Sequence, residues 1–360
     1  MNLATIHENT NQKISRIPNT KYATNKQLDI HMKTPISVAI AGCGYWGSNH
    51  VRVMHELGCA ITLCDTDTSR IGSLQEKFPD VKTTTSYSDI LSNDTIDAVV
   101  ISTPAETHYD LAKKALISGK HVLVEKPMAL EPIQATELIN LSQRQNTTLM
   151  VGHLMRFHPA IIKLKELVDN GELGKLQYMY STRLNMGKVR REENALWSFA
   201  PHDISITLHL KGKLPKRVSA TGGAYLQPSI ADVSLSSMEF DDGTRSHIFV
   251  SWLHPYKEQK LVVVGEHKMA VFDDSQPVDK LGLFDREINF IDGNFVTNKP
   301  QRYSVSLAKN EPLVTENLHF LNCIRTRENP ITNGEEGLKV LTVLKACQES
   351  LIKGGYPTNL

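Results

Sequence analysis

The sequence of 360 residues lacks the features that mark several large classes of protein. Its five cysteines are Cys43, Cys59, Cys64, Cys323 and Cys347, and no CxxC pair occurs. An odd number without that spacing argues against a disulfide framework or a zinc cage and is typical of a reducing cytoplasm. No uninterrupted apolar run approaches the ~18–20 residues that a membrane span requires. We therefore expect a cytoplasmic protein with no metal site and no membrane partner.

The chain also lacks an excess of charge of either sign. Lys and Arg number 40 and Asp and Glu number 39, so the formal net charge is +1. A nucleic-acid-binding protein would need a basic face, so we expect no nucleic-acid partner. Apolar residues make up 40% of the chain, which is ordinary globular composition, and the length suggests roughly two domains.

The first 34 residues differ from the rest in composition. They are rich in Asn, Thr and Lys, and they lack the apolar h-region of about 7–15 residues that a secretory signal contains. We interpret residues 1–34 as a mobile tail outside the fold.

Short β-branched runs alternate with helix-like stretches from residue 35 to residue 153. Strands are expected over 36–41, 60–65, 97–102, 121–125 and 148–152. A first helix is expected after the glycine-rich segment 42–47 and should end at about Leu57. Further helices are expected over 68–77, 105–118 and 130–145, and Asp67 or Thr68 would cap the helix over 68–77. This alternation predicts an α/β domain over residues 35–153, built on a parallel, doubly wound sheet.

A different pattern follows a further helix expected over 157–169. Beyond Gly174 the chain contains long strand-like segments over 176–185, 217–224, 232–240, 244–253 and 259–265. Asp242-Gly243 between two alternating runs is a strong hairpin signal. An amphipathic helix is expected over 335–353. We predict a second, α+β domain over residues 154–360, with a large, mostly antiparallel open sheet.

A glycine-rich turn joins the first strand to the first helix. In Gly42-x-Gly44-x-x-Gly47, the first glycine permits a tight turn, the second lets the backbone approach a pyrophosphate, and the third lets the helix pack closely. The helix N-terminus presents free N–H groups to the phosphates. Asp65 at the end of the second strand can accept hydrogen bonds from ribose hydroxyls and would repel a 2′-phosphate, which favours NAD over NADP, although Arg70 is nearby. The alternative is a plain turn followed by a solvated carboxylate.

Two further segments follow strands at the edge of the sheet where ligands bind. One is Thr103–His108 and the other is Glu125-Lys126-Pro127. The ammonium of Lys126 could hydrogen-bond a reacting oxygen and stabilise developing alkoxide charge. The alternative is an exposed lysine at a strand end.

Taken together, Ala41–Gly47, Ser102-Thr103-Pro104 with Thr107-His108, and Glu125-Lys126-Pro127 resemble the glucose–fructose oxidoreductase, inositol dehydrogenase and rhizopine-catabolism (Gfo/Idh/MocA) family over about residues 35–355. The resemblance implies an N-terminal Rossmann domain, a C-terminal domain on a large open sheet, a homodimer or homotetramer, and Lys126 as the catalytic lysine. The cofactor-binding candidates are Gly42, Cys43, Gly44, Tyr45, Trp46, Gly47, Asp65, Thr103, Pro104, Thr107, His108, Glu125 and Lys126.

His202 is the second catalytic candidate. It lies near the start of a helix-like run to Leu210, and an imidazole pKa near 6.5 suits a general base, although a packing histidine is the alternative. Many members of the family carry Asp four residues before this histidine, whereas this chain has Ser198, and the side chain of Asp203 would point elsewhere. The Ala200-Pro201-His202 run resembles the branch that oxidises C3 of UDP-sugars, in which Lys and His carry the chemistry.

Polar residues after the first domain supply the substrate candidates. They are Lys126, His153, Arg156, His158, Arg183, Asn185, Trp197 and His202. An arginine can bind a carboxylate or phosphate bidentately, and the basic loop 183–191 would suit a diphosphate and a uracil ring. The alternative is a solvated loop balanced by Glu192 and Glu193. We expect Trp252–Pro255 to form a loop that faces the site. The alternative is that Trp252 belongs to the core.

These residues predict NAD-dependent oxidation of a sugar hydroxyl, at C3 of a UDP-N-acetylhexosamine or its uronic acid. The 3-keto product would suit a partner aminotransferase. The alternatives on the same scaffold are oxidation of a free sugar or inositol and reduction of a keto sugar nucleotide. A non-catalytic NAD(H)-sensing regulator is the alternative from another class.

Overall fold

The computed structural model describes residues 35–187 and 189–360. The predicted tail, residues 1–34, lies outside the described residues. The described residues belong to one compact unit.

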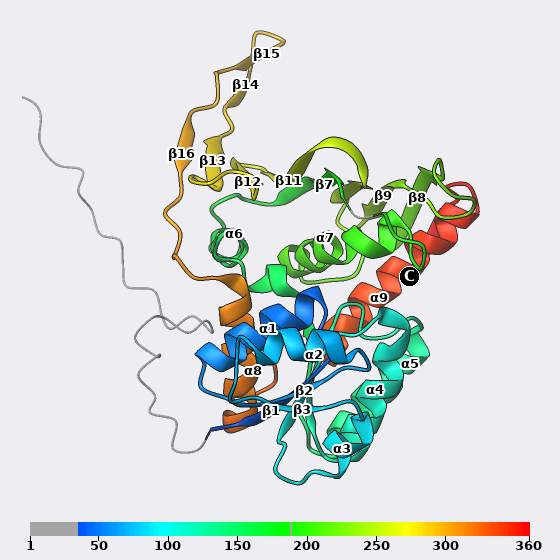
Figure 1. Cartoon of the computed structure of the whole chain (residues 1–360). Helices are drawn as coiled ribbons and strands as arrows, with labels where there is room; N and C mark the ends of the chain where they lie inside the picture. Colours follow the sequence, from blue (N-terminus) through cyan, green and yellow to red (C-terminus); the bar gives the residue numbers. More distant parts are fainter. Residues whose placement is uncertain (1–34, 188) are drawn as a thin grey trace, which may run out of the picture. The chain divides into compact units, whose positions relative to one another are not determined.

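The N-terminal part is built on a six-stranded parallel sheet (Figure 1). Its strands are β1 Ser37–Ala41, β2 Ala60–Cys64, β3 Lys82–Thr84, β4 Ala98–Ile101, β5 His121–Glu125 and β6 Leu149–Gly152. They lie in the order β3-β2-β1-β4-β5-β6, and every neighbouring pair is parallel. Every residue of β4 and β6 is buried, as expected for a parallel sheet covered on both faces. The predicted doubly wound sheet is confirmed.

Helices from both ends of the described chain cover this sheet. They are α1 Tyr45–Glu56, α2 Thr68–Gln75, α3 Tyr87–Ser92, α4 Ala105–Ile117, α5 Pro132–Arg144, α8 Pro312–Thr326 and α9 Gly334–Ile352. Asp67 caps α2 by accepting a hydrogen bond from the Ser69 main chain. Phe320 and Leu321 of α8 share a core with Val38 of β1, while Leu341 of α9 joins the core on the other face. The structure therefore attaches the last two helices to the first sheet, which the sequence patterns did not indicate.

The second sheet has nine strands in the order β16-β13-β12-β11-β7-β10-β9-β8-β17. Their bounds are β7 Leu176–Met186, β8 Arg217–Gly223, β9 Val233–Glu239, β10 Arg245–Ser251, β11 Leu253–Gly265, β12 Lys268–Asp273, β13 Leu281–Asp285, β16 Arg302–Ser304 and β17 Thr358–Asn359. Only β7 and β10 are parallel among these described neighbours. The predicted hairpin at Asp242-Gly243 joins β9 to β10, where Gly243 has φ +84°. A large, mostly antiparallel sheet is confirmed.

Helices α6 Pro159–Asp169 and α7 Ala195–Lys211 cover one face of the second sheet, and their apolar residues share cores with the strands (Figure 1). Part of α9, with Val343 and Leu344, joins the same core at β8. The helix expected over 157–169 begins instead at Pro159, after a 3₁₀ turn η2 over Leu154–Phe157. Proline suits the first helical position because its missing N–H would be unpaired there in any case. The opposite face of the sheet exposes side chains such as Tyr178, Tyr180 and Leu235.

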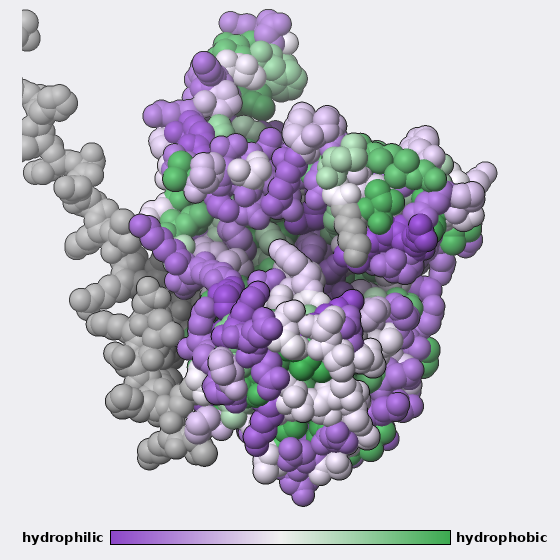
Figure 2. Space-filling view, viewed as in Figure 1, coloured by the Kyte–Doolittle hydropathy of each residue, from purple (hydrophilic) through white to green (hydrophobic). Residues whose placement is uncertain are grey.

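A separate hairpin extends from this sheet (Figure 1). It consists of β14 Ile288–Ile291 and β15 Asn294–Thr297, and every residue of both strands is exposed. The exposed side chains include Phe290 and Phe295, whose rings touch, and Figure 2 shows hydrophobic residues gathered at this hairpin. Among the described residues, no helix is both long and apolar enough to cross a membrane.

Candidate active site

A cavity of about 1470 Å³ lies against the carboxyl ends of β1, β2, β4 and β5. This is more than the ~300–1,000 Å³ of a typical small-molecule site, so it can hold a dinucleotide together with a substrate. Its position is where ligands bind in doubly wound sheets, next to the reversal of strand order between β1 and β4.

The glycine loop has the shape that a pyrophosphate requires. A Cβ on Gly47 would stand 1.8 Å from the carbonyl oxygen of Gly42, and a Cβ on Gly42, where φ is +90°, would meet Ser102 at 2.8 Å. In contrast, a Cβ on Gly44 would have no described atom within 4 Å, because this residue faces the cavity. Gly44 is the N-cap of α1, and no described side chain caps the helix. The first N–H groups of α1 are therefore available to an anion.

Asp65 is held rigidly at the end of β2. Its Oδ2 accepts a hydrogen bond of 2.6 Å from the Cys43 main chain, and its Oδ1 accepts one of 2.9 Å from the Asp67 main chain. The carboxylate still lines the cavity and keeps lone pairs for ribose hydroxyls. Arg70 lies 3.8 Å from Asp65 and 3.2 Å from Asp67, so two carboxylates already attract its guanidinium. These groups suit an unphosphorylated ribose, as in NAD.

His108 links the two loops beyond β4 and β5. Its Nδ1 lies 2.7 Å from the Pro127 carbonyl, and its Nε2 lies 2.8 Å from the Thr103 carbonyl. The Thr107 hydroxyl lies 2.7 Å from that of Thr103 and is absent from the described cavity lining. Ten cofactor candidates line the cavity, namely Gly42, Gly44, Tyr45, Trp46, Asp65, Thr103, Pro104, His108, Glu125 and Lys126. Cys43, Gly47 and Thr107 are not among the described lining residues, and the individual roles of all thirteen remain predictions.

Lys126 lies where the two parts of the molecule meet. Its side chain lines the cavity, and its Nζ donates a hydrogen bond of 3.0 Å to the main-chain carbonyl of Ser198 on α7. Burial lowers the pKa of Lys126, whereas the negative charges of Glu193 and Glu125 oppose that shift. Lys126 is therefore a half-buried amine whose pKa lies below that of an exposed lysine.

His202 lies one helical turn beyond Ser198, so both residues are on the same face of α7. Its Nδ1 is buried without a hydrogen-bond partner among the described residues. Burial lowers the pKa of His202 well below 6.5, and the positive charges of Lys126 and Arg183 lower it further. The imidazole is therefore neutral near pH 7. His202 is not part of the described cavity lining, so its catalytic role remains a prediction.

His153 belongs to the same buried group. It is 3% exposed, and neither ring nitrogen has a partner among the described residues. Burial lowers its pKa to about 3, with the charges of Arg156 and Lys126 acting in the same direction. Neutral imidazoles at positions 153 and 202 thus accompany the Lys126 amine.

Three of the basic side chains among the substrate candidates already have acidic partners inside the protein. Arg156 lies 3.3 Å from Glu336, the His158 ring lies 3.3 Å from Asp274, and Arg183 donates a 2.7 Å hydrogen bond to Asp203. Asp203 thus pairs with an arginine of β7, and its side chain points elsewhere than to His202, as expected. These side chains are buried, and the described cavity lining includes none of them. Their contact with a substrate remains a prediction.

The remaining candidates divide between the cavity and the core. Trp197 lines the cavity, and its Nε1 donates a 3.0 Å hydrogen bond to Gln348 of α9. Asn185 is half-buried, and its Oδ1 has no partner among the described residues. Trp252 is fully buried, and its Nε1 donates a hydrogen bond to Asp232. It therefore belongs to the core, which is the second of its two interpretations.

Several lining residues were not among the candidates. From the loop before α7 and from α9 they are Arg190, Glu192, Glu193, Asn194, Lys345 and Gln348. Arg190 lies 2.9 Å from Glu193 and 3.6 Å from Glu192, which matches the balanced-loop interpretation of this segment. The helical pattern of α9 was visible in the sequence, but nothing in it indicated that Lys345 and Gln348 face the cavity.

The comparisons with known proteins agree with this geometry. Residues 36–153 match an oxidoreductase family with an NAD-binding Rossmann fold, GFO/IDH/MocA, and residues 161–271 match the C-terminal domain of the same family. The chain belongs to the GFO/IDH/MocA family. It is an NAD-dependent oxidoreductase, as the resemblance implied.

Several relatives cover most of this member's length. It is 28% identical to the uncharacterized oxidoreductase YrbE of Bacillus subtilis over 90% of this chain and 96% of YrbE. It is 27% identical to the UDP-N-acetylglucosamine 3-dehydrogenase of Acidithiobacillus ferrooxidans over 87% of this chain and 95% of that enzyme. A solved structure of that enzyme superposes with a TM-score of 0.78 at 25% identity and covers 88% of this chain and 98% of its own. The scyllo-inositol 2-dehydrogenase of Bacillus subtilis is 26% identical over 76% of this chain and 80% of that enzyme.

Proposed function

We propose that this protein oxidises a sugar hydroxyl with NAD⁺, at C3 of a UDP-N-acetylhexosamine or its uronic acid, and releases a 3-keto sugar nucleotide. The observation that carries the proposal is the hydrogen bond from Lys126 Nζ to Ser198 on α7, one turn before His202. It brings the amine at the end of β5 to the same helix face as the neutral imidazole. The similarity to a UDP-N-acetylglucosamine 3-dehydrogenase supports the choice of sugar nucleotide.

Each residue of the site has a distinct part in this reaction. When bound, the cofactor would supply the hydride acceptor for this oxidation. Lys126 would donate a hydrogen bond to the reacting oxygen and stabilise the negative charge that develops there. His202, which is neutral because burial depresses its pKa, would take the hydroxyl proton. Asp65 and the glycine loop would hold the cofactor, and α7 would close the site from the second domain.

A panel of potential substrates tests this function. The full-length protein is incubated with NAD⁺ and each of UDP-N-acetylglucosamine, its uronic acid, glucose and myo-inositol, and absorbance of the reduced nicotinamide is followed. A keto acid is added in parallel reactions as a second oxidant, because tightly held NADH would otherwise mask turnover. We expect turnover with a UDP-sugar and at most a trace with the free polyols. The reverse pattern would reject the proposed substrate.

Oxidation of a free polyol is the second candidate. The similarity to a scyllo-inositol 2-dehydrogenase favours it, as does the pairing of Arg156 with Glu336 and of Arg183 with Asp203. Those arginines are the cations that a diphosphate would otherwise attract. Turnover with myo-inositol but not with UDP-sugars identifies this activity, and reduction of a keto sugar nucleotide by NADH identifies the reverse reaction. A non-catalytic NAD(H) sensor would give no turnover in any arm.

The proposed reaction also implies a partner enzyme. A 3-keto sugar nucleotide carries a carbonyl that a partner aminotransferase can convert to an amine. We also propose a homodimer or homotetramer, because the nine-stranded sheet exposes one face with Tyr178, Tyr180 and Leu235 on it.

A further inference from the structure

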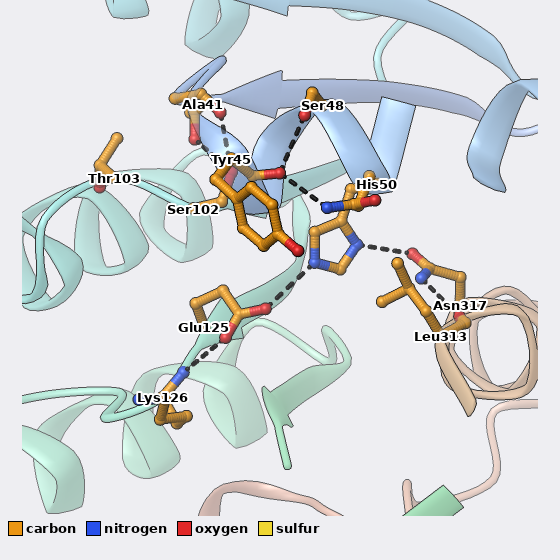
Figure 3. A network of polar contacts seen from close by, with 12 residues as sticks. Ala41, Tyr45, Ser48, His50, Ser102, Thr103, Glu125, Lys126, Leu313 and Asn317 are labelled. Atoms are coloured by element: carbon orange, nitrogen blue, oxygen red, sulfur yellow. Dashed lines mark hydrogen bonds and ion pairs between the residues drawn. The ribbon is translucent and has the colours of Figure 1, made fainter. Parts of the chain in front are cut away.

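A chain of hydrogen bonds connects α8 to the end of β5 (Figure 3). The Asn317 side-chain amide donates a 2.8 Å hydrogen bond to the Leu313 carbonyl, so its Oδ1 is the atom that faces His50 Nδ1 at 3.0 Å. An amide oxygen can only accept, which means that Nδ1 of His50 carries a proton and donates. The other ring nitrogen, Nε2, lies 3.2 Å from Glu125 Oε1.

This arrangement fixes a proton on Nδ1 of His50 and calls for a second proton between Nε2 and Glu125. Because Nδ1 is already protonated, a hydrogen bond between Nε2 and Oε1 needs one further proton, which the His50 ring and the Glu125 carboxyl share. The pair is net neutral wherever that proton lies. His50 and Asn317 are 0% exposed, and a buried pair of this kind avoids an uncompensated charge. Asn317 thus sets the tautomer of His50, and His50 sets the position of one Glu125 oxygen.

The Glu125 side chain is also confined from other directions. Its Oε2 accepts a 3.2 Å hydrogen bond from the Lys126 main chain. A Cβ on Gly152 of β6 would stand 3.1 Å from both the carboxyl carbon and Oε2 of Glu125, so glycine leaves just enough room. The carboxylate is therefore held in one place at the cavity wall.

Glu316, the residue before Asn317, does not compete for His50. Its carboxyl group is fully buried and has no hydrogen-bond partner among the described residues. Burial raises its pKa well above 4.5, and the charge of Glu125 raises it further. Burial thus disfavours the charged form of Glu316, and the contact with His50 belongs to Glu125.

The topology indicates what Glu125 faces. The sheet order reverses between β1 and β4, and a dinucleotide bound there places one nucleoside at β2 and the other beyond β4 and β5. Asp65 lies at the nucleoside position next to β2, and Glu125 lies at the other one, at the end of β5. We propose that His50 and Asn317 are positioning residues, which hold the Glu125 carboxylate for the nicotinamide riboside half of the cofactor and make α8 part of the cofactor site. This rests on NAD binding and is independent of the sugar substrate.

Comparing the binding of NADH with that of ADP distinguishes a positioning role of these residues from a general structural role. NADH fills both halves of the site, whereas ADP reaches only the Asp65 half and the glycine loop. Dissociation constants for both are measured by fluorescence and calorimetry on the full chain with Asn317→Leu, His50→Leu and His50→Gln. We expect NADH to bind about tenfold more weakly to both leucine variants, the typical cost of losing a hydrogen bond to a charged group, with ADP unchanged. His50→Gln, which keeps a donor for Glu125, should recover most of the loss.

A control variant, His55→Leu, and an independent variant, Gly152→Ala, complete the test. His55→Leu removes an exposed histidine from the same helix, where it lies 3.1 Å from Asp80, and should leave both constants unchanged. Gly152→Ala displaces the Glu125 carboxylate without touching α8 and should weaken NADH but not ADP, so the proposal can be judged even where a His50 variant fails to fold. Unchanged NADH binding in Asn317→Leu and Gly152→Ala, or an equal loss for NADH and ADP, would overturn the proposal.

Discussion

The side-chain amine of Lys126 is joined to the main-chain carbonyl of Ser198 by a hydrogen bond of 3.0 Å. This bond crosses from the six-stranded sheet to the helix that covers the nine-stranded sheet. It places the amine beside Ser198, one helical turn before His202. The backbone of α7 thus provides an acceptor for the lysine where no carboxylate is available at position 198.

Lys126→Met should abolish turnover while leaving cofactor binding intact. Methionine fills a similar volume but donates no hydrogen bond, so the developing charge on the substrate oxygen loses its stabilisation, and we expect a loss of at least about a hundredfold in kcat. NADH affinity should change little. The control Lys113→Met removes an ammonium from the surface of α4, where it pairs with Glu137 at 2.8 Å. Turnover that survives Lys126→Met would remove the lysine from the mechanism.

Asp65→Asn should shift the cofactor preference. The substitution keeps one acceptor for the Cys43 or Asp67 main chain but removes the negative charge that repels a 2′-phosphate. Arg70, freed from one of its two carboxylates, could then contact that phosphate. We expect NADH to bind about tenfold more weakly and NADPH more tightly than in the wild type. Equal weakening of both, measured by fluorescence titration, would show that Asp65 acts only on loop structure.

His121→Asn should make stability less dependent on pH. His121 Nδ1 accepts a hydrogen bond of 2.9 Å from the Thr148 main chain, and burial together with the Arg327 charge lowers its pKa to about 4. The unfolded chain, with a pKa near 6.5, therefore binds the extra proton first, so stability is lost as pH falls from about 6.5 to about 4. Asparagine supplies an acceptor that does not titrate.

The measurement is the free energy of unfolding in urea at several pH values. In that window we expect the slope for His121→Asn to be shallower than for the wild type by up to about 1.4 kcal/mol per pH unit. His153, with a pKa of about 3, and His319, with a pKa of about 4, also make stability depend on pH, so part of the slope remains in both proteins. His55→Asn, an exposed site, is the control. Parallel curves for His121→Asn and wild type would contradict the assignment.

Local patterns predicted the parts of the molecule that depend on neighbouring residues. The glycine loop, the acid at the end of β2 and the lysine at the end of β5 each follow directly from a strand, and topology brings strand ends together. The hairpin at Asp242-Gly243 is equally local. Each of these features could be placed without knowledge of the rest of the chain.

Distant partners could not be predicted in the same way. Arg156 pairs with Glu336, 180 positions away, and His50 with Asn317, 267 positions away, so the sequence shows the residue types but not the pairs. The apolar stripe of α8 does not reveal which sheet it covers. A cation expected to bind substrate can therefore be neutralised by an acid far along the chain, and a buried histidine can belong to the cofactor site unnoticed.

Leu235→Glu should dissociate an oligomer of this protein. Leu235 is 46% exposed on the uncovered face of the nine-stranded sheet, directly opposite Phe249 on β10, and Tyr178 and Tyr180 extend this apolar face along β7. A glutamate there would be buried without a partner in an interface formed by two such faces, which costs several kcal/mol.

Light scattering of the full chain measures the mass. We expect a dimer or tetramer for the wild type and for Ile133→Glu, an exposed position on α5, and a smaller species for Leu235→Glu. Phe295→Glu on the β14–β15 hairpin discriminates between the two apolar surfaces of this part of the protein. Dissociation by Phe295→Glu alone would place the interface at the hairpin and refute the role of the open sheet face.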